Sequence, residues 1–235
     1  MSRFCAALGT AILAIFPGWA AEAALIAVDT GHTPLRYGAT APDGRVEYQY
    51  NLTLSSAVSR ELTAKGDQVF RISADGNEVE LAKRATLAPD ASLFVSIHHD
   101  SIQQAWIDAG RRREFAGFSL FVSEKNPHYA ESLACAKGVA ERLLAIGEMP
   151  SGYHATPIPG ENRPFIDKRL GIHRFDDLVV LKTATMPALL IEAGVIANPD
   201  EARRLAAAET VDRLARAIAE GLHACQNPSS TRSTQ

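Results

Sequence analysis

The sequence has no excess of positive charge. Its 24 lysine and arginine residues are outnumbered by 27 aspartate and glutamate residues, and the formal net charge is −3. Proteins that bind nucleic acid use clustered Lys and Arg side chains to neutralise phosphates, and anionic membranes attract similar basic clusters. The composition therefore argues against a nucleic-acid partner and against a protein held on a membrane by charge.

Cysteine is scarce, with three residues in a chain of 235. None of them lies in the short Cys-x-x-Cys spacing that is typical of zinc sites and redox centres, so thiol chemistry is not indicated. Cys135 and Cys225 could form a disulfide. Two separate buried thiols are equally compatible with the sequence, because spacing says nothing about proximity.

Long hydrophobic runs are also lacking, apart from a short one at residues 4–16. This run follows Arg3 and gives way to a stretch of small residues at 20–24. The order is typical of a secretory signal peptide, and the run is shorter than the roughly 20 residues that span a membrane. We therefore interpret residues 1–23 as a leader and expect an exported protein of the periplasm or cell envelope, without a membrane span after leader removal. The alternative is an uncleaved anchor or an apolar first helix.

The rest of the chain has a globular composition, 46% hydrophobic and 22% charged, and no internal repeat. Short apolar runs alternate with longer stretches of helical periodicity. This alternation is typical of an α/β domain whose twisted, mostly parallel sheet is flanked by helices. We expect a single domain over residues 24–225, followed by a disordered polar tail at 226–235.

The expected elements can be placed approximately. Strands are expected at 25–28, 68–72, 92–97, 117–122, 178–181 and 187–191. Helices are expected at 48–65, 78–87 and 128–144, and a last helix begins at Pro199, capped by Asn198.

Three of the expected strands end in an ionisable side chain, namely His32, His98 and Glu192. In open α/β sheets, ligands bind beyond the carboxyl ends of the strands. Each residue alone has an ordinary explanation, such as a surface histidine or a salt bridge between Glu192 and Lys182. Together they predict a metal site or an acid–base cluster.

Four motifs surround these residues. They are Asp29-Thr30-Gly31-His32, Glu47 followed by Asn51 at the start of the first long helix, Ser96-Ile97-His98, and residues 187–199 around Glu192. In this order the motifs resemble the zinc-dependent N-acetylmuramoyl-L-alanine amidases of the amidase type 3 family. The resemblance covers residues 25–222, and Arg84 stands where the family tends to keep an arginine.

The resemblance implies one zinc ion (Zn²⁺) held by His32, Glu47 and His98, with Glu192 as the general base. Two imidazoles and one carboxylate suit zinc and leave a fourth position open. The implied activity is hydrolysis of the amide bond between N-acetylmuramic acid and L-Ala in peptidoglycan. The implied partners are the peptidoglycan substrate and, as for some relatives, an activator protein of the envelope.

Candidates for substrate binding are Asn51, Arg84, His154 and Arg163. The last two lie in the segment 147–169, whose many Pro and Gly residues predict a long loop over or beside the cleft. A plain surface loop is the alternative.

Some alternatives stay open. Side chains alternate along a strand, so His99 faces away from His98, and we favour His98 as the ligand. Asp100 either orients a ligand imidazole or forms a turn. The chain could also be a different zinc peptidase or a small-molecule amidohydrolase of the envelope, or a catalytically silent envelope binding protein.

Overall fold

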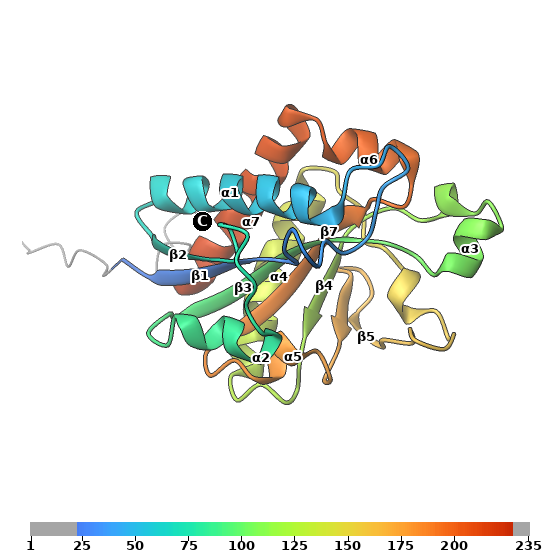
Figure 1. Ribbon diagram of the computed structural model, residues 1–235. Helices are drawn as coiled ribbons and strands as arrows, with labels where there is room; N and C mark the ends of the chain where they lie inside the picture. The colour runs from blue at the N-terminus through green and yellow to red at the C-terminus, as the bar shows by residue number, and fades with distance from the viewer. Residues whose placement is uncertain (1–22, 228–235) are drawn as a thin grey trace, which may run out of the picture.

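The computed structural model describes residues 23–227 and contains one seven-stranded sheet (Figure 1). Its strands are β1 (Leu25–Thr30), β2 (Gln68–Ile72), β3 (Leu93–Asp100), β4 (Ser119–Val122), β5 (Phe165–Asp167), β6 (Ile172–Arg174) and β7 (Ala188–Val195). The strand order is β2-β1-β3-β7-β4-β6-β5. All neighbours are parallel except β4–β7 and β5–β6. The predicted α/β domain with a mostly parallel sheet is confirmed.

Helices cover both faces of this sheet (Figure 1). They are α1 (Glu47–Ala64), α2 (Leu81–Arg84), α3 (Gln104–Asp108), α4 (Tyr129–Ala145), α5 (Val179–Lys182), α6 (Pro199–Leu205) and α7 (Ala208–Gln226). The described residues also contain the 3₁₀ turns η1 (Ala85–Leu87), η2 (Arg112–Glu114) and η3 (Tyr153–Ala155), each between a helix and the next strand. Helices α1, α4 and α7 form the layer on one face, and the short helices α2 and α5 cover part of the other.

Alternate residues of the central strands enter two different cores. Val95 and Ile97 of β3 belong to the core beneath α1, α4 and α7, whereas Phe94 belongs to the smaller core beneath α2 and α5. Leu190 of β7 lies on the same side as Phe94. Because successive side chains of a strand point to opposite faces, this alternation tells which face each functional residue occupies.

The segment predicted as a strand at 178–181 is a helix, α5, so that prediction is wrong. A four-residue apolar run has too little periodicity to separate a strand from a helical turn. Here Val180 and Leu181 are buried in the smaller core, against the sheet rather than within it. The predicted burial of this apolar segment is confirmed, but the segment is helical and not extended.

Two predicted helices also differ in extent. The helix expected at 78–87 is reduced to α2 and η1, and the last helix is divided into α6 and α7. The start of α6 is as predicted, since the Asn198 side chain accepts a hydrogen bond from the Asp200 N–H and Pro199 follows directly. The segments α3, β5 and β6 were not predicted.

The predicted leader and tail fall almost wholly outside the described residues. Of the leader, residues 1–22 lie outside, and of the tail, residues 228–235. Gln226 is the last residue of α7 rather than the first of a tail. Within residues 23–227, no helix combines the length and the apolar character that crossing a membrane requires.

A disulfide joins Cys135 of α4 to Cys225 of α7 and thereby links two helices of the same layer. These helices approach closely: a Cβ at Gly221 would lie 2.6 Å from the Val139 Cα. The pairing that the sequence left open is therefore present in the structure. It spans a sequence separation of 90 residues, which includes β7 and the segment 147–169.

We expect the double variant Cys135→Ala/Cys225→Ala to unfold more easily than the wild type. Removing a crosslink over a sequence separation of 90 residues frees the unfolded chain, which should lower the free energy of unfolding by about 2–4 kcal/mol. Urea unfolding under oxidising conditions measures the difference. A reducing agent should shift the wild type to the midpoint of the double variant and leave the variant unmoved. Equal midpoints for both oxidised proteins would contradict the expectation.

Candidate metal centre

His32 is placed by a turn at the carboxyl end of β1. The Gly31 N–H donates to the Ile97 carbonyl oxygen at 3.0 Å, and the Asn51 amide donates to the Gly31 carbonyl oxygen at 3.1 Å. His32 then adopts a φ of 67°, in the left-handed region that residues with a side chain rarely occupy. Such a conformation persists only when the surrounding structure imposes it.

Glu47 reaches the same place from the first residue of α1. Its carboxylate is almost fully buried and accepts hydrogen bonds from the Ala39 N–H at 3.0 Å and from the Asn51 amide at 3.1 Å. Asn51 stands one helical turn after Glu47, so both lie on the same side of α1. Asn51 therefore holds the Glu47 carboxylate and the Gly31 turn at once.

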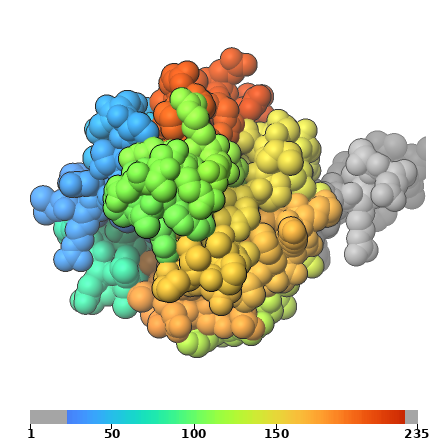
Figure 2. All heavy atoms as spheres, turned by 90° about the vertical axis from the view of Figure 1, so that its right-hand side faces the viewer, coloured from blue at the N-terminus to red at the C-terminus, as the bar shows by residue number. Residues whose placement is uncertain are grey.

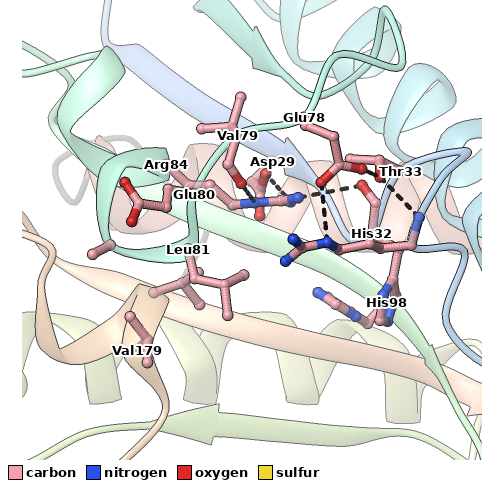
Figure 3. A pocket seen from close by; sticks show the side chains of 13 residues that line it. Asp29, His32, Thr33, Glu78, Val79, Glu80, Leu81, Arg84, His98 and Val179 are labelled. Carbon is pink, nitrogen blue, oxygen red and sulfur yellow. Dashed lines mark hydrogen bonds and ion pairs between the residues drawn. The ribbon is translucent and has the colours of Figure 1, made fainter.

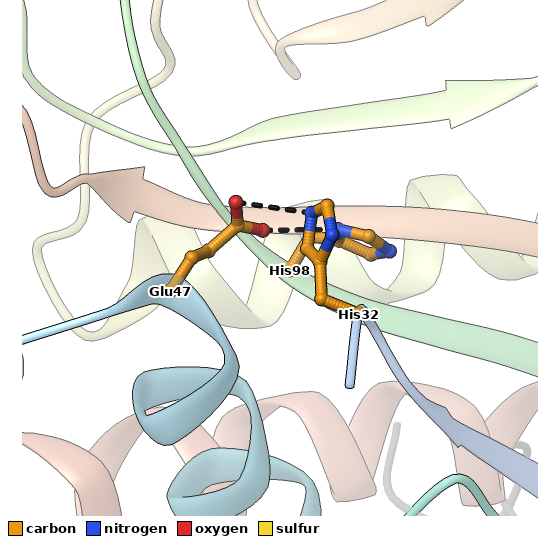
Figure 4. A group of neighbouring side chains, drawn as sticks. All are labelled: His32, Glu47 and His98. Atoms are coloured by element: carbon orange, nitrogen blue, oxygen red, sulfur yellow. Dashed lines mark hydrogen bonds and ion pairs between the residues drawn. The ribbon is translucent and has the colours of Figure 1, made fainter. Parts of the chain in front are cut away.

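His32, Glu47 and His98 converge on one point (Figure 4). The His32 Nε2 lies 3.1 Å from the Glu47 Oε2, and the His98 Nδ1 lies 3.1 Å from the Glu47 Oε1. One ligand atom from each residue lies within 4.8 Å of the other two. Zinc bonds of about 2.0–2.1 Å in tetrahedral geometry separate ligand atoms by roughly 3.3 Å. Both the spacing and the donor types of this cluster fit a zinc ion.

The electrostatics of the cluster also favour a cation. Burial raises the pKa of Glu47, but the hydrogen bonds with His32 and His98 outweigh burial and hold the pKa well below its usual range. Burial lowers the pKa of His32, and the hydrogen bond and charge of Glu47 outweigh this and raise it. Glu47 therefore stays ionised, and a buried carboxylate requires compensating positive charge.

The two neighbouring histidines of β3 have different surroundings. His98 lies on the face of Phe94 and joins the cluster, whereas His99 lies on the opposite face beneath α1. The His99 Nδ1 is 2.9 Å from the Asn51 Oδ1, and burial lowers the pKa of His99 to about 3. His99 is thus a neutral partner of Asn51 behind the cluster.

Two glycines leave room for these side chains. A Cβ at Gly31 would lie 2.4 Å from the His98 ring, and a Cβ at Gly38 would lie 2.3 Å from the Glu47 Oε2 and 2.7 Å from the His32 ring. Gly38 was not predicted as part of the site. Its only sequence signal is its place between His32 and Glu47.

Glu192 stands beside His98. The two residues are register partners on the parallel strands β3 and β7, so they occupy the same face of the sheet. Ser119 of β4 is the partner of Glu192 on its other side. The Glu192 Oε2 is buried and has no hydrogen-bond partner among residues 23–227. The predicted salt-bridge alternative with Lys182 does not occur.

The pKa of Glu192 is raised well above its usual range. Burial is the main cause, the negative charges of Asp100 and Glu47 raise the pKa further, and the positive charge of His154 opposes them. A carboxyl group with a raised pKa and an uncommitted oxygen is suited to accept and return a proton. Glu192 therefore has the properties of a general base beside the candidate ligand cluster.

Arg84 lies beneath this edge of the sheet. Its guanidinium donates to the Asp29 Oδ1 and to the Thr30 carbonyl oxygen, both at 2.9 Å, and to the His32 carbonyl oxygen at 3.3 Å. The side chain is 4% exposed and Asp29 is fully buried. The guanidinium of Arg84, predicted as a substrate-binding residue, thus donates to the Asp29 carboxylate and to the backbone that carries His32.

His154 and Arg163, the two loop candidates, also contact protein groups. His154 lies between the carboxylates of Asp100 and Glu161, at 2.8 Å and 2.9 Å. Arg163 donates to the carbonyl oxygens of Glu161 and Gly160, and its Cζ lies 4.0 Å from the centre of the Phe175 ring. The link between Asp100 and His154 was not predicted, because no local pattern connects two segments so far apart in the chain.

The segment 151–165 packs against the segment that carries α3, and the two border each other in Figure 2 in gold and green. The Gln103 N–H donates to the Tyr153 hydroxyl at 2.8 Å, and the rings of Trp106 and Phe115 pack on Tyr153. The predicted loop contains the ordered elements η3 and β5. Its His154 lies beside Asp100 at the end of β3.

A cavity of about 490 Å³ adjoins two of the candidate ligands (Figure 3). His32 and His98 line one end, and Leu81 and Val179 give it an apolar wall. Arg36, at the polar rim, lies 3.5 Å from a Glu78 carboxylate oxygen. The cavity is therefore open to a molecule that reaches the candidate ligands His32 and His98.

Comparison with known proteins agrees with this geometry. A profile of the N-acetylmuramoyl-L-alanine amidase family matches residues 26–224. Similar solved structures include the amidase AmiC2 of Nostoc punctiforme, with 25% identity and a TM-score of 0.66 over 85% of this chain and 95% of that one. An N-acetylmuramoyl-L-alanine amidase from Clostridium difficile 630 has 22% identity and a TM-score of 0.70 over 91% of this chain and 100% of that one.

A third similar structure is the CwlD amidase from Clostridioides difficile in complex with the GerS lipoprotein. It has 20% identity and a TM-score of 0.67 over 87% of this chain and 99% of that one. No curated protein is similar enough to match. The matches define the chain as an amide hydrolase. More particularly, it belongs to the N-acetylmuramoyl-L-alanine amidase family, which confirms the resemblance seen in its motifs.

We expect Gly38→Ala to weaken zinc binding, and Gly44→Ala provides a matched control. Both glycines have positive φ, +76° and +88°, so both variants carry the same backbone strain. A Cβ at position 38 would collide with Glu47 and His32. A Cβ at position 44 would have no atom within 4 Å. Zinc affinity should fall roughly 10- to 100-fold in Gly38→Ala alone, as for other displaced ligands. Competition titration with a chelating dye measures it, and equal affinities would refute the expectation.

Proposed function

We propose that this protein is a zinc-dependent amidase that hydrolyses the bond between the lactyl group of N-acetylmuramic acid and L-Ala in peptidoglycan. The observation that carries the proposal is the position of Glu192, in register with His98 on the neighbouring strand. A candidate base thus adjoins a two-histidine, one-carboxylate cluster in a chain of the amidase family. Neither feature alone would define a hydrolase.

His32 Nε2, His98 Nδ1 and the Glu47 carboxylate would hold one zinc ion, with a position left open for reactants. When bound, zinc supplies Lewis-acid polarisation of the scissile carbonyl and lowers the pKa of a water molecule. Asn51 and the Ala39 N–H keep the Glu47 carboxylate aligned through their hydrogen bonds. Outer partners of this kind orient the ligands of a metal.

Glu192 would take a proton from the attacking water and deliver it to the amine of L-Ala as that group leaves. Its raised pKa suits this exchange, because a base that is too acidic returns the proton poorly and one that is too basic is not ionised. Its Oε2 makes no hydrogen bond within the described part of the chain, so no other contact competes for the proton.

An enzyme that acts on peptidoglycan has to reach the cell wall, outside the cytoplasm. We infer export to the periplasm or cell envelope, supported by the leader-like pattern at residues 1–23. A protein activator of the envelope fits the same setting, since the similar amidase CwlD forms a complex with a lipoprotein. The cavity beside His32 and His98 would take one side of the substrate.

Glu192→Gln should keep zinc but lose activity on purified peptidoglycan. The amide has nearly the same shape as the carboxylate but cannot accept the proton, so kcat should fall about 10²- to 10⁴-fold. Mass spectrometry of the soluble products measures the release of stem peptides that begin with L-Ala. His32→Ala, by contrast, should lose zinc as well as activity.

Glu131→Gln is the matched control, because its side chain is 61% exposed and lies on α4 away from the site. It should act like the wild type. Chelation should stop the wild type, and added zinc should restore it. The proposal fails if Glu192→Gln releases these peptides at the wild-type rate, or if the wild type produces cuts only within the stem peptide.

A further inference from the structure

His154 is held between two carboxylates in a nearly buried position. Its Nε2 lies 2.8 Å from the Asp100 Oδ2 and its Nδ1 lies 2.9 Å from the Glu161 Oε2. The three side chains are only 8–15% exposed. An ion pair shielded from water to this degree is costly to break, because removing one partner leaves an uncompensated buried charge.

The bridge lies next to the proposed catalytic residues. Asp100 ends β3, two residues after His98, and the pairing of β3 with β7 shifts between these two residues. Glu192 of β7 is close enough for its charge to interact with His154 and Glu161. His154 therefore contributes positive charge at a place where three carboxyl groups gather.

Contacts around the imidazole restrict its movement. The Arg163 N–H donates to the His154 carbonyl oxygen at 2.6 Å, and the rings of Phe121 and Tyr153 pack edge-on against the imidazole at 4.9 Å and 5.0 Å. His173 packs behind it and is itself held, 3.0 Å from the Arg163 carbonyl oxygen. The His154 Nδ1 thus forms a hydrogen bond with Glu161, and the Nε2 lies in ion-pair contact with Asp100 without hydrogen-bond alignment.

We propose that His154 is a positioning residue of this hydrolase: its imidazolium bridges Asp100 and Glu161, fastens the segment 151–165 to the end of β3, and balances the carboxylates beside Glu192. The inference rests on the proposed function, because it takes Glu192 as the catalytic base. It replaces the expectation that His154 binds substrate. Asp100 then serves the bridge rather than a ligand imidazole.

The charge state of His154 can be tested without any assay of activity. Burial lowers the pKa of His154, but the charge of Asp100 and the hydrogen bond with Glu161 outweigh burial and raise the pKa to about 10. At pH 8, ¹⁵N–¹H spectra of histidine-labelled wild-type protein should show His154 with both ring nitrogens protonated. His154→Gln and Glu161→Gln identify the signal, which should vanish in the first variant and shift in the second. A neutral His154 ring at this pH would overturn the proposal.

Kinetics separate positioning from substrate binding. His154→Gln should lower kcat roughly 10- to 100-fold, the size expected when a reacting group is displaced by about 1 Å, while KM and zinc content stay within about twofold of the wild type. His128→Gln is the matched control: the same substitution at a side chain that is 44% exposed at the start of α4. It should match the wild type in all three quantities. A change confined to KM would show a substrate contact and overturn the proposal.

The triple variant Asp100→Asn/His154→Gln/Glu161→Gln separates charge balance from a loss of folding. The single variant His154→Gln leaves the buried carboxylates of Asp100 and Glu161 without a cation. The triple variant removes both carboxylates as well. Its kcat should therefore be at least about tenfold higher than that of His154→Gln. A triple variant as impaired as the single one would overturn the charge-balancing role. The melting temperature of each protein is measured first, and all assays are run at a temperature at which every variant is folded.

These results are distinguishable from failure of the proposed function. If the wild type released no stem peptides that begin with L-Ala, the proposed function would fail, and the spectra would still report on the bridge. If the wild type were active and His154→Gln equalled it in kcat, the inference about His154 would fail and the proposed function would stand.

Discussion

The buried carboxylate of Glu47 is the constraint on which the functional edge of this protein depends. Its two oxygens face the Ala39 N–H, the Asn51 amide and the rings of His32 and His98. Burying a carboxylate is costly unless positive charge compensates it. The fold meets this requirement by bringing two imidazoles to the same point from two different strands. The same two imidazoles therefore compensate the charge of Glu47 and complete the candidate set of metal ligands.

The parallel sheet makes this coincidence possible. The carboxyl ends of β1, β3 and β7 meet at one edge, so His32, His98 and Glu192 come together although they are far apart in the chain. Asn51 links α1 to the ends of β1 and β3, because its side chain contacts the Gly31 turn, the Glu47 carboxylate and His99. A one-residue change in the register of β3 would move His98 and Glu192 apart and turn His98 to the face covered by α1, α4 and α7.

The parts of the site that could be predicted are those with a local pattern. His32 follows a glycine at a strand end, Glu47 begins a helix, and His98 and Glu192 each end an apolar run. The segment 178–181 could not be assigned correctly, because four apolar residues fit a strand and a helical turn equally well. The disulfide and the Asp100–His154 bridge could not be found either. Contacts between distant segments depend on packing, and no periodicity in one sequence encodes them.

The proposed mechanism has two parts, metal binding and proton transfer by Glu192, and different elements of the structure determine each part. Turns, a helix start and strand register place the proposed metal ligands, so their positions are tied to the fold itself. The charge around Glu192 comes mainly from Asp100 and Glu47, and His154 and Glu161 of the segment 151–165 add to it. Substitutions in that segment can alter the base without moving the ligands.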